Sequence, residues 1–162
     1  MIRRMVRAKD YVLTYHAFDE MIADDLHEYD LEHIVMNGFI TRRETDQQTQ
    51  EPKLVVYGPT TQGLAAEIVA KIKPKGYDGD YHGVFAMNES LCPVCGGTAT
   101  IKHVTKAFGQ GNDLLVIEGI PVIACRACHE HYLTAQTLSE IERLRERGHH
   151  DARVVPVERY AA

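Results

Sequence analysis

The sequence has no long apolar run. No stretch of its 162 residues approaches the roughly 18 consecutive apolar residues that a membrane-spanning helix requires. Its opening segment, MIRRMVRAKDYVLTYH, contains basic residues but no apolar segment long enough for a secretory signal peptide. We therefore expect no membrane segment and a cytoplasmic location.

The sequence also lacks an excess of basic charge. It has 18 Lys and Arg residues against 23 Asp and Glu residues, for a net charge of −5. Residues 1–90 carry 10 basic and 15 acidic side chains, whereas residues 91–162 carry 8 of each. Because neither half would attract a polyanion through its net charge, the composition does not favour binding of RNA or DNA. The 44% apolar and 25% charged content is typical of a globular protein.

The first half changes from a helical to a strand period. Apolar residues at helical spacing predict helices over residues 2–10, 15–26 and 31–38. Thr14 and Asp30 are the expected N-caps of the second and third helices, and Gly38 is the expected C′ glycine of the third. Alternation and β-branched content then predict strands over 39–45, 53–58, 63–72 and 81–89. This pattern predicts an α+β domain over residues 1–90, with N-terminal helices and an antiparallel β meander.

The second half, residues 91–162, reads as a smaller domain built on a hairpin. Two β runs at 98–108 and 114–125 are separated by turn-forming residues at 109–113. A helix is expected over 135–148, with Thr134 as its N-cap and Gly148 as its stop. The apolar tail 153–160 contains Pro156 and predicts an edge strand, which would extend a sheet of this chain or of a second copy. A homo-oligomer therefore stays open.

Four cysteines, Cys92, Cys95, Cys125 and Cys128, form two C-x-x-C pairs. In a reducing compartment such pairs indicate metal ligands rather than disulfides, and a hairpin between them would bring both pairs to one ion. Four thiolates in a tetrahedron select zinc, and backbone N–H groups of Gly96 and Gly97 are placed to donate to the sulfurs. Because the four ligands leave no position for water, the zinc is expected to be structural.

Other readings of the cysteines stay open. The pairs could instead be a redox dithiol or unrelated free thiols. A site of three cysteines with His129 or His131 as the fourth ligand is a further alternative.

Residues 91–150 resemble the zinc-binding domain of the YgiT-type, or MqsA-type, antitoxins. The stretches CPVCGG and EGIPVIACRACHEHYL, the hairpin between the pairs and the helix that follows carry the resemblance, and Glu130 fits the family signature after the second pair. The resemblance implies a structural zinc and a domain that grips a toxin. It also implies a separate DNA-binding domain in the full-length antitoxin, for which this chain has no room.

Residues 11–73 resemble a family of unknown function whose architecture is similar to the RelE and BrnT ribonuclease toxins. The stretches LTYHAFDEM, HIVMNG and KLVVYG carry this resemblance. Together the two resemblances imply a toxin-like domain fused to its antitoxin-like zinc domain, with the two in contact within one chain. RNA cleavage of the RelE type needs an acid or base and cations that bear phosphate charge. The candidates are His16, Arg42, Arg43, Lys71 and His82.

Each candidate also has an ordinary structural interpretation. A histidine near a helix start commonly caps it, and exposed arginines and lysines are commonly just solvated. The acidic net charge also opposes binding of a polyanion, which favours a chain without catalytic activity. Two alternatives to the fused pair remain: a non-catalytic interaction or regulatory module with structural zinc, and an active RelE-like endoribonuclease.

Overall fold

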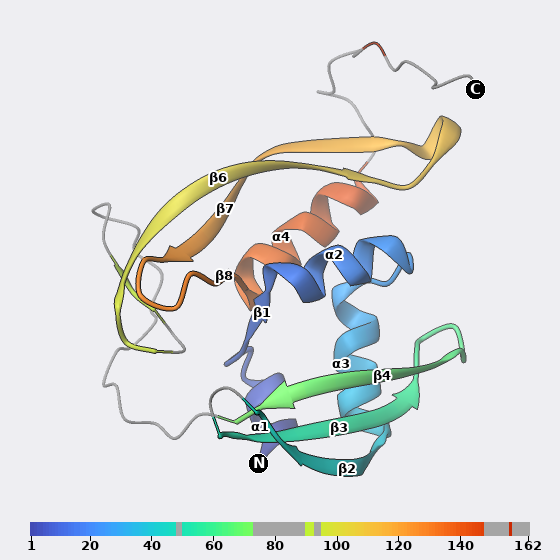
Figure 1. The fold of residues 1–162 in the computed structure, drawn as a ribbon. Helices are drawn as coiled ribbons and strands as arrows, with labels where there is room; N and C mark the ends of the chain where they lie inside the picture. The colour runs from blue at the N-terminus through green and yellow to red at the C-terminus, as the bar shows by residue number, and fades with distance from the viewer. Residues whose placement is uncertain (48–49, 73–89, 93–94, 148–155, 157–162) are drawn as a thin grey trace, which may run out of the picture.

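A computed structural model describes residues 1–47, 50–72, 90–92, 95–147 and 156, and most of its helices come first in the chain, before a long series of strands (Figure 1). The helices are α1 (Ile2–Arg7), α2 (Tyr15–Ala23), α3 (Glu28–Asn37), α4 (Ala135–Glu146) and the short 3-10 helix η1 (Gly111–Asp113). The strands are β1 (Val12–Thr14), β2 (Phe39–Thr45), β3 (Pro52–Pro59), β4 (Ala65–Lys71), β5 (Ser90–Leu91), β6 (Thr98–Phe108), β7 (Leu115–Cys125) and β8 (His131–Thr134).

These strands form two antiparallel sheets. One has the order β1-β8-β7-β6-β5 and the other the order β2-β3-β4. The long β6–β7 hairpin curves over α2 and α4, while the three-stranded sheet lies on the opposite side of the molecule, against α3 (Figure 1). The α+β class that the sequence predicts is confirmed.

The two halves of the chain share one sheet. β1 from the first half pairs with β8 from the second, with Val12 opposite Thr134 and Leu13 opposite Leu133. They also share one apolar cluster, since Leu13 and Phe18 lie in the same group of buried side chains as Phe108, Val122 and Leu133. The boundary at residue 90 stays a prediction, but the described parts of the two halves bury their apolar surface together.

Local capping explains where α2 and α3 begin. The Thr14 hydroxyl accepts the backbone N–H of Ala17 at 3.2 Å, which confirms it as the N-cap of α2. The prediction that Asp30 caps α3 was wrong, because α3 begins at Glu28 with His27 as its N-cap. Asp30 occupies the third helical position, and its carboxylate accepts the backbone N–H of His27 at 3.0 Å.

Gly38 ends α3 as expected, but for a different reason. Its φ of −81° is open to any residue, so no left-handed conformation requires glycine here. A Cβ at Gly38 would instead lie 2.4 Å from the carbonyl oxygen of Tyr57. Gly58 faces it, and a Cβ there would lie 2.7 Å from the Cα of Gly38. Two glycines therefore let the end of α3 press against the backbone of β3.

The strand predictions for 39–45 and 98–108 are confirmed to the residue, and those for β3, β4 and β7 to within one or two residues. The Thr134 cap of α4 is also confirmed, because its hydroxyl accepts the backbone N–H of Thr137 at 3.1 Å. The predicted strand 81–89, the stop at Gly148 and the tail 153–160 lie outside the described residues, except for the exposed Pro156.

Candidate metal centre

The thiols of Cys92, Cys95, Cys125 and Cys128 all lie within 4.8 Å of one another. The Sγ atoms of Cys92 and Cys128 are 3.8 Å apart, and those of Cys95 and Cys125 are 3.4 Å apart. A tetrahedron with metal–sulfur bonds of about 2.3 Å has sulfur–sulfur edges of about 3.8 Å, whereas a disulfide bond is about 2.05 Å long. The four free cysteines therefore form a cage that can hold a metal ion and no disulfide.

The β6–β7 hairpin closes the long interval between the two cysteine pairs. β6 begins at Thr98, directly after the first pair, and β7 ends at Cys125. Pairing of Ala99 with Cys125 in this hairpin returns the chain to its start, as the sequence predicts. A backbone hydrogen bond of 3.0 Å from the Cys125 N–H to the carbonyl of Glu130 then closes the turn around the second pair.

Backbone N–H groups donate hydrogen bonds to the sulfurs of Cys95 and Cys125. Gly97 donates to the Cys95 sulfur at 3.4 Å, and Ala127 and Cys128 donate to the Cys125 sulfur at 3.3 and 3.4 Å. The same donor role predicted for Gly96 was wrong, because its N–H donates to the Cys92 carbonyl at 2.9 Å. Donors aimed at sulfur stabilise thiolates, which are the form that binds metal.

The N–H group of Cys128, followed by that of Ala127, lowers the pKa of the Cys125 thiol to about 6. Tyr132 lies on the other side of the cage, with its hydroxyl 3.6 Å from the Cys128 sulfur. Burial and this contact raise the pKa of Tyr132 well above its ordinary value, so it remains a neutral hydrogen-bond donor. The cage thus favours a negative sulfur at Cys125 and supplies a neutral donor beside the sulfur of Cys128.

Close packing joins the two cysteine turns. A Cβ at Gly97 would lie 2.7 Å from the Cβ of Ala127 and 3.3 Å from the Cys95 sulfur. His129 and His131 follow the second pair, but neither belongs to the group of converging ligand atoms found among the described residues. The His131 ring instead lies edge-on to the Tyr15 ring, with the two ring centroids 6.1 Å apart. The geometry favours four sulfur ligands over three sulfurs and one histidine.

The predicted catalytic residues that the structure describes lie on α2, β2 and β4, which carry none of the four cysteines. His16 stands on α2 with its side chain 83% exposed, and its Nδ1 lies 3.9 Å from a carboxylate oxygen of Glu20. Arg42 on β2 pairs with Glu44 at 3.1 Å and with Glu67 at 3.2 Å. These contacts place carboxylates beside both groups.

Two of the remaining candidates, Lys71 and Arg43, lie on the three-stranded sheet and not on α2 with His16. Lys71, at the end of β4, pairs with Asp46 at 2.9 Å and with Glu51 at 3.6 Å, and these carboxylates raise its pKa. Arg43 is exposed on β2, and His82 lies outside the described residues. The catalytic roles of all five residues stay predictions.

Sequence reasoning missed a buried polar network between the two halves. The side chain of Glu28 is only 6% exposed. One of its oxygens accepts from Lys9 at 3.0 Å and from Tyr11 at 2.8 Å, and the other accepts from Ser139 on α4 at 2.7 Å. No sequence pattern signals it, because Glu28 and Ser139 are 111 positions apart.

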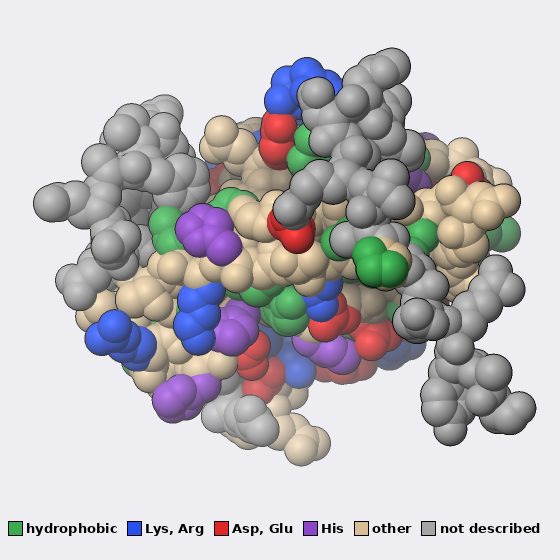
Figure 2. Space-filling model, turned by 90° about the horizontal axis from the view of Figure 1, so that it is seen from above, with side chains coloured by type: hydrophobic (Ala, Val, Ile, Leu, Met, Phe, Trp, Pro, Cys, Tyr) green, Lys and Arg blue, Asp and Glu red, His purple; other side chains and the backbone are tan. Residues whose placement is uncertain are grey.

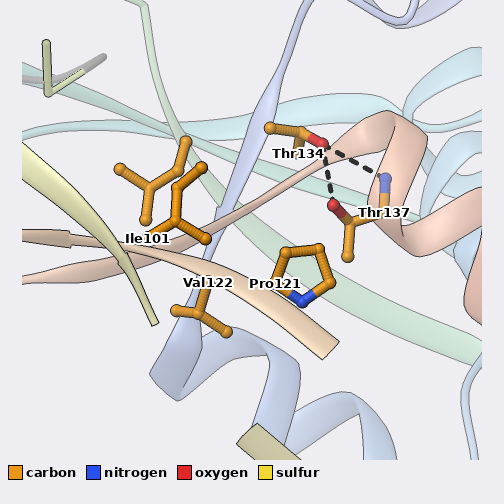
Figure 3. Close-up of a pocket in the computed structure, with 6 residues that line it drawn as sticks. Ile101, Pro121, Val122, Thr134 and Thr137 are labelled. Atoms are coloured by element: carbon orange, nitrogen blue, oxygen red, sulfur yellow. Dashed lines mark hydrogen bonds between the residues drawn. The ribbon is translucent and has the colours of Figure 1, made fainter. Parts of the chain in front are cut away.

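A hollow beside the Thr134 cap is too small for a ligand. Its volume is about 10 Å³, enough for about one water molecule. Figure 3 shows Thr134 joined by hydrogen bonds to Thr137, beside the apolar side chains of Ile101, Pro121 and Val122. This hollow therefore belongs to the packing of α4 on the sheet.

Comparison of the chain with protein-family models, curated proteins and solved structures finds no match. Within the described residues, no helix is both long and apolar enough to cross a membrane.

Proposed function

We propose that the cage holds one zinc ion per chain and that the zinc is structural. Soft thiolate ligands in a tetrahedron select zinc, and the sulfur separations of 3.4 and 3.8 Å are close to those of such a site. Four protein ligands leave no position for water or substrate. The ion would stabilise the fold by joining the start of β6 to the end of β7 and the turn before β8.

Metal analysis of the purified protein tests this site. We expect about one equivalent of zinc per chain, and we expect Cys92→Ser to lose it and to melt at a lower temperature. His131→Ala is the matched control, because it alters the first residue of β8, next to the second cysteine turn, without removing a sulfur. Zinc retained by Cys92→Ser but lost from His131→Ala would reject the four-cysteine site in favour of a histidine ligand.

For the whole chain, we propose a toxin–antitoxin-type protein in which the antitoxin-like half holds the toxin-like half inactive. The resemblances of residues 11–73 and 91–150 support the two assignments. The pairing of β1 with β8 is the observation that carries the proposal, because it inserts the second half directly beside the start of α2. Lys106 on β6 reinforces the contact through an ion pair with Asp19 on α2. A partner built into one sheet is present at high effective concentration.

Loosening this contact in the full-length chain tests the proposal. Leu133→Ala removes a fully buried side chain opposite Leu13, at the boundary between the halves. We expect its expression in bacteria to arrest growth and degrade RNA, and we expect His16→Ala in the same chain to restore growth. Ile34→Ala is the matched control, because Ile34 is also buried but lies on α3 beside the three-stranded sheet. Its expression should leave growth unchanged.

A non-catalytic interaction module is the second candidate. The ion pairs of Arg42 and Lys71 favour it, because their charges are already balanced by carboxylates of the same chain. A Leu133→Ala chain that stays folded, exchanges amide hydrogens faster in β1 and β8, and leaves growth and RNA intact would reject the inhibited toxin and leave this module.

A further inference from the structure

A groove of about 440 Å³ opens beside the metal centre. Its floor is the buried Ala124 of β7, which pairs with Thr100 of β6 on one side and His131 of β8 on the other. Because these three residues share one face of the sheet, the small alanine between two larger side chains leaves a hollow. Lys102, Arg126 and His129 also line it, together with Cys125 of the cysteine cage. The volume is within the range of about 300–1,000 Å³ that is typical of small-ligand sites.

The groove is lined by basic side chains, whereas the chain as a whole is acidic. Although the chain has a net charge of −5, no aspartate or glutamate is among the described residues that line the groove. Lys106 on β6 and Arg143 on α4 are paired with carboxylates, whereas Lys102 and Arg126 have no ion pair among the described residues. Figure 2 shows Lys, Arg and His side chains gathered toward the left of the molecule, the side on which Figure 1 draws the start of β6 and the end of β7.

The two cysteine turns differ at one position in a way that points to the same groove. The residue after each pair adopts a left-handed conformation, with φ of 71° at Gly96 and 60° at His129. Glycine adopts this conformation without strain, whereas a histidine is disfavoured there. The backbone of the second turn is therefore strained at His129, a residue that lines the groove. Backbone strain of this kind is typical of binding sites.

We infer that this groove binds the phosphate group of a small phosphorylated molecule. The Arg126 guanidinium and the Lys102 ammonium supply charge, and the hydroxyl of Thr100 and the imidazoles supply hydrogen-bond donors. A long polyanion fits less well, because the net charge of the chain would repel it outside this groove. The inference goes beyond the proposed function and does not depend on it.

Calorimetric titration of the full-length protein as purified tests the inference. The probes are inorganic phosphate, ADP, a ten-nucleotide oligoribonucleotide and a hexaglutamate peptide. We expect phosphate and ADP to bind with an affinity that falls as salt rises, and the difference between them reports whether a nucleoside adds contacts. Arg126→Gln and Lys102→Gln should each weaken binding by about tenfold, as expected for loss of a charge-assisted hydrogen bond. Arg143→Gln, which removes the same charge from the exposed face of α4, should leave affinity unchanged.

His129→Gly separates a binding role from a structural one. Relief of the left-handed strain should raise the melting temperature by about 2 to 4 °C, while loss of the imidazole should weaken phosphate binding. Absence of phosphate and ADP binding would overturn the inference, as would equal weakening by Arg143→Gln. Binding of only the oligoribonucleotide or only the peptide would overturn it in favour of a macromolecular partner.

Discussion

The hydrogen bond from Ser139 to Glu28 gives a direct measure of how strongly the two halves are joined. Ser139→Ala would leave one carboxylate oxygen of the nearly buried Glu28 without its donor, while Lys9 and Tyr11 continue to bind the other. A hydrogen bond to a charged group contributes about 1.5 to 3 kcal/mol to stability. Alanine regains about 0.5 kcal/mol through its higher helix propensity. We therefore expect a net loss of about 1.5 kcal/mol, or about 3 to 6 °C in melting temperature for a chain of this size.

Urea unfolding followed by circular dichroism measures this loss. The midpoint should fall with an unchanged slope, because the variant alters stability and not the surface exposed on unfolding. Gln136→Ala is the matched control on the same helix, since Gln136 is exposed and its stability should change by less than about 0.5 kcal/mol. A Ser139→Ala chain as stable as this control would refute the claim that the Glu28 network holds the halves together.

Three further predictions follow from buried contacts. Burial alone would raise the pKa of Asp30, but hydrogen bonds from Thr61 and His27 outweigh burial and lower that pKa. The stability that the ionised carboxylate contributes is therefore present above about pH 4 and is lost as pH falls further. In Asp30→Asn, the free energy of unfolding should fall less steeply below about pH 4 than in the unmodified chain. Gly58→Ala should cost more than 2 kcal/mol in urea unfolding because its Cβ would meet backbone, whereas Gly63→Ala, with a φ of 81° and nothing near, should cost about 1 kcal/mol; equal losses would contradict the close approach. Chelation should speed hydrogen exchange in β1 and β8 before it does so in β3, and a uniform increase would contradict a local effect of the metal.

The sequence predicted the features that local patterns encode. Thr14 and Thr134 were recognisable as helix caps because a cap is decided by a few neighbouring residues. The cysteine pairs were recognisable because C-x-x-C is itself a turn, and the β runs between them imply the hairpin that joins them. The same local rules failed at Asp30, which has the carboxylate of a typical cap but lies inside the first turn of α3, where that carboxylate accepts the backbone N–H of the true N-cap, His27.

Contacts between distant segments were not predictable in this way. β1 and β8 are three and four residues long, are separated by more than a hundred residues and have no turn between them to signal pairing. The groove could not be predicted for the same reason. Lys102 lies on β6, far along the chain from Arg126 and His131, and only the five-stranded sheet brings these residues together. Such sites depend on strand order and register, which a single sequence does not specify.

The shared sheet gives the metal centre a route to the first half of the chain. Tyr132 touches the Cys128 sulfur with its hydroxyl, and its backbone pairs with Thr14, the N-cap of α2. A single residue of β8, Tyr132, therefore lies between the cage and the start of the helix that carries His16. If the cage holds the proposed zinc, its loss would release the turn before β8, then the β1–β8 pairing, while the three-stranded sheet keeps its own contacts with α3. A structural metal can in this way control the contact between the halves without taking part in any reaction.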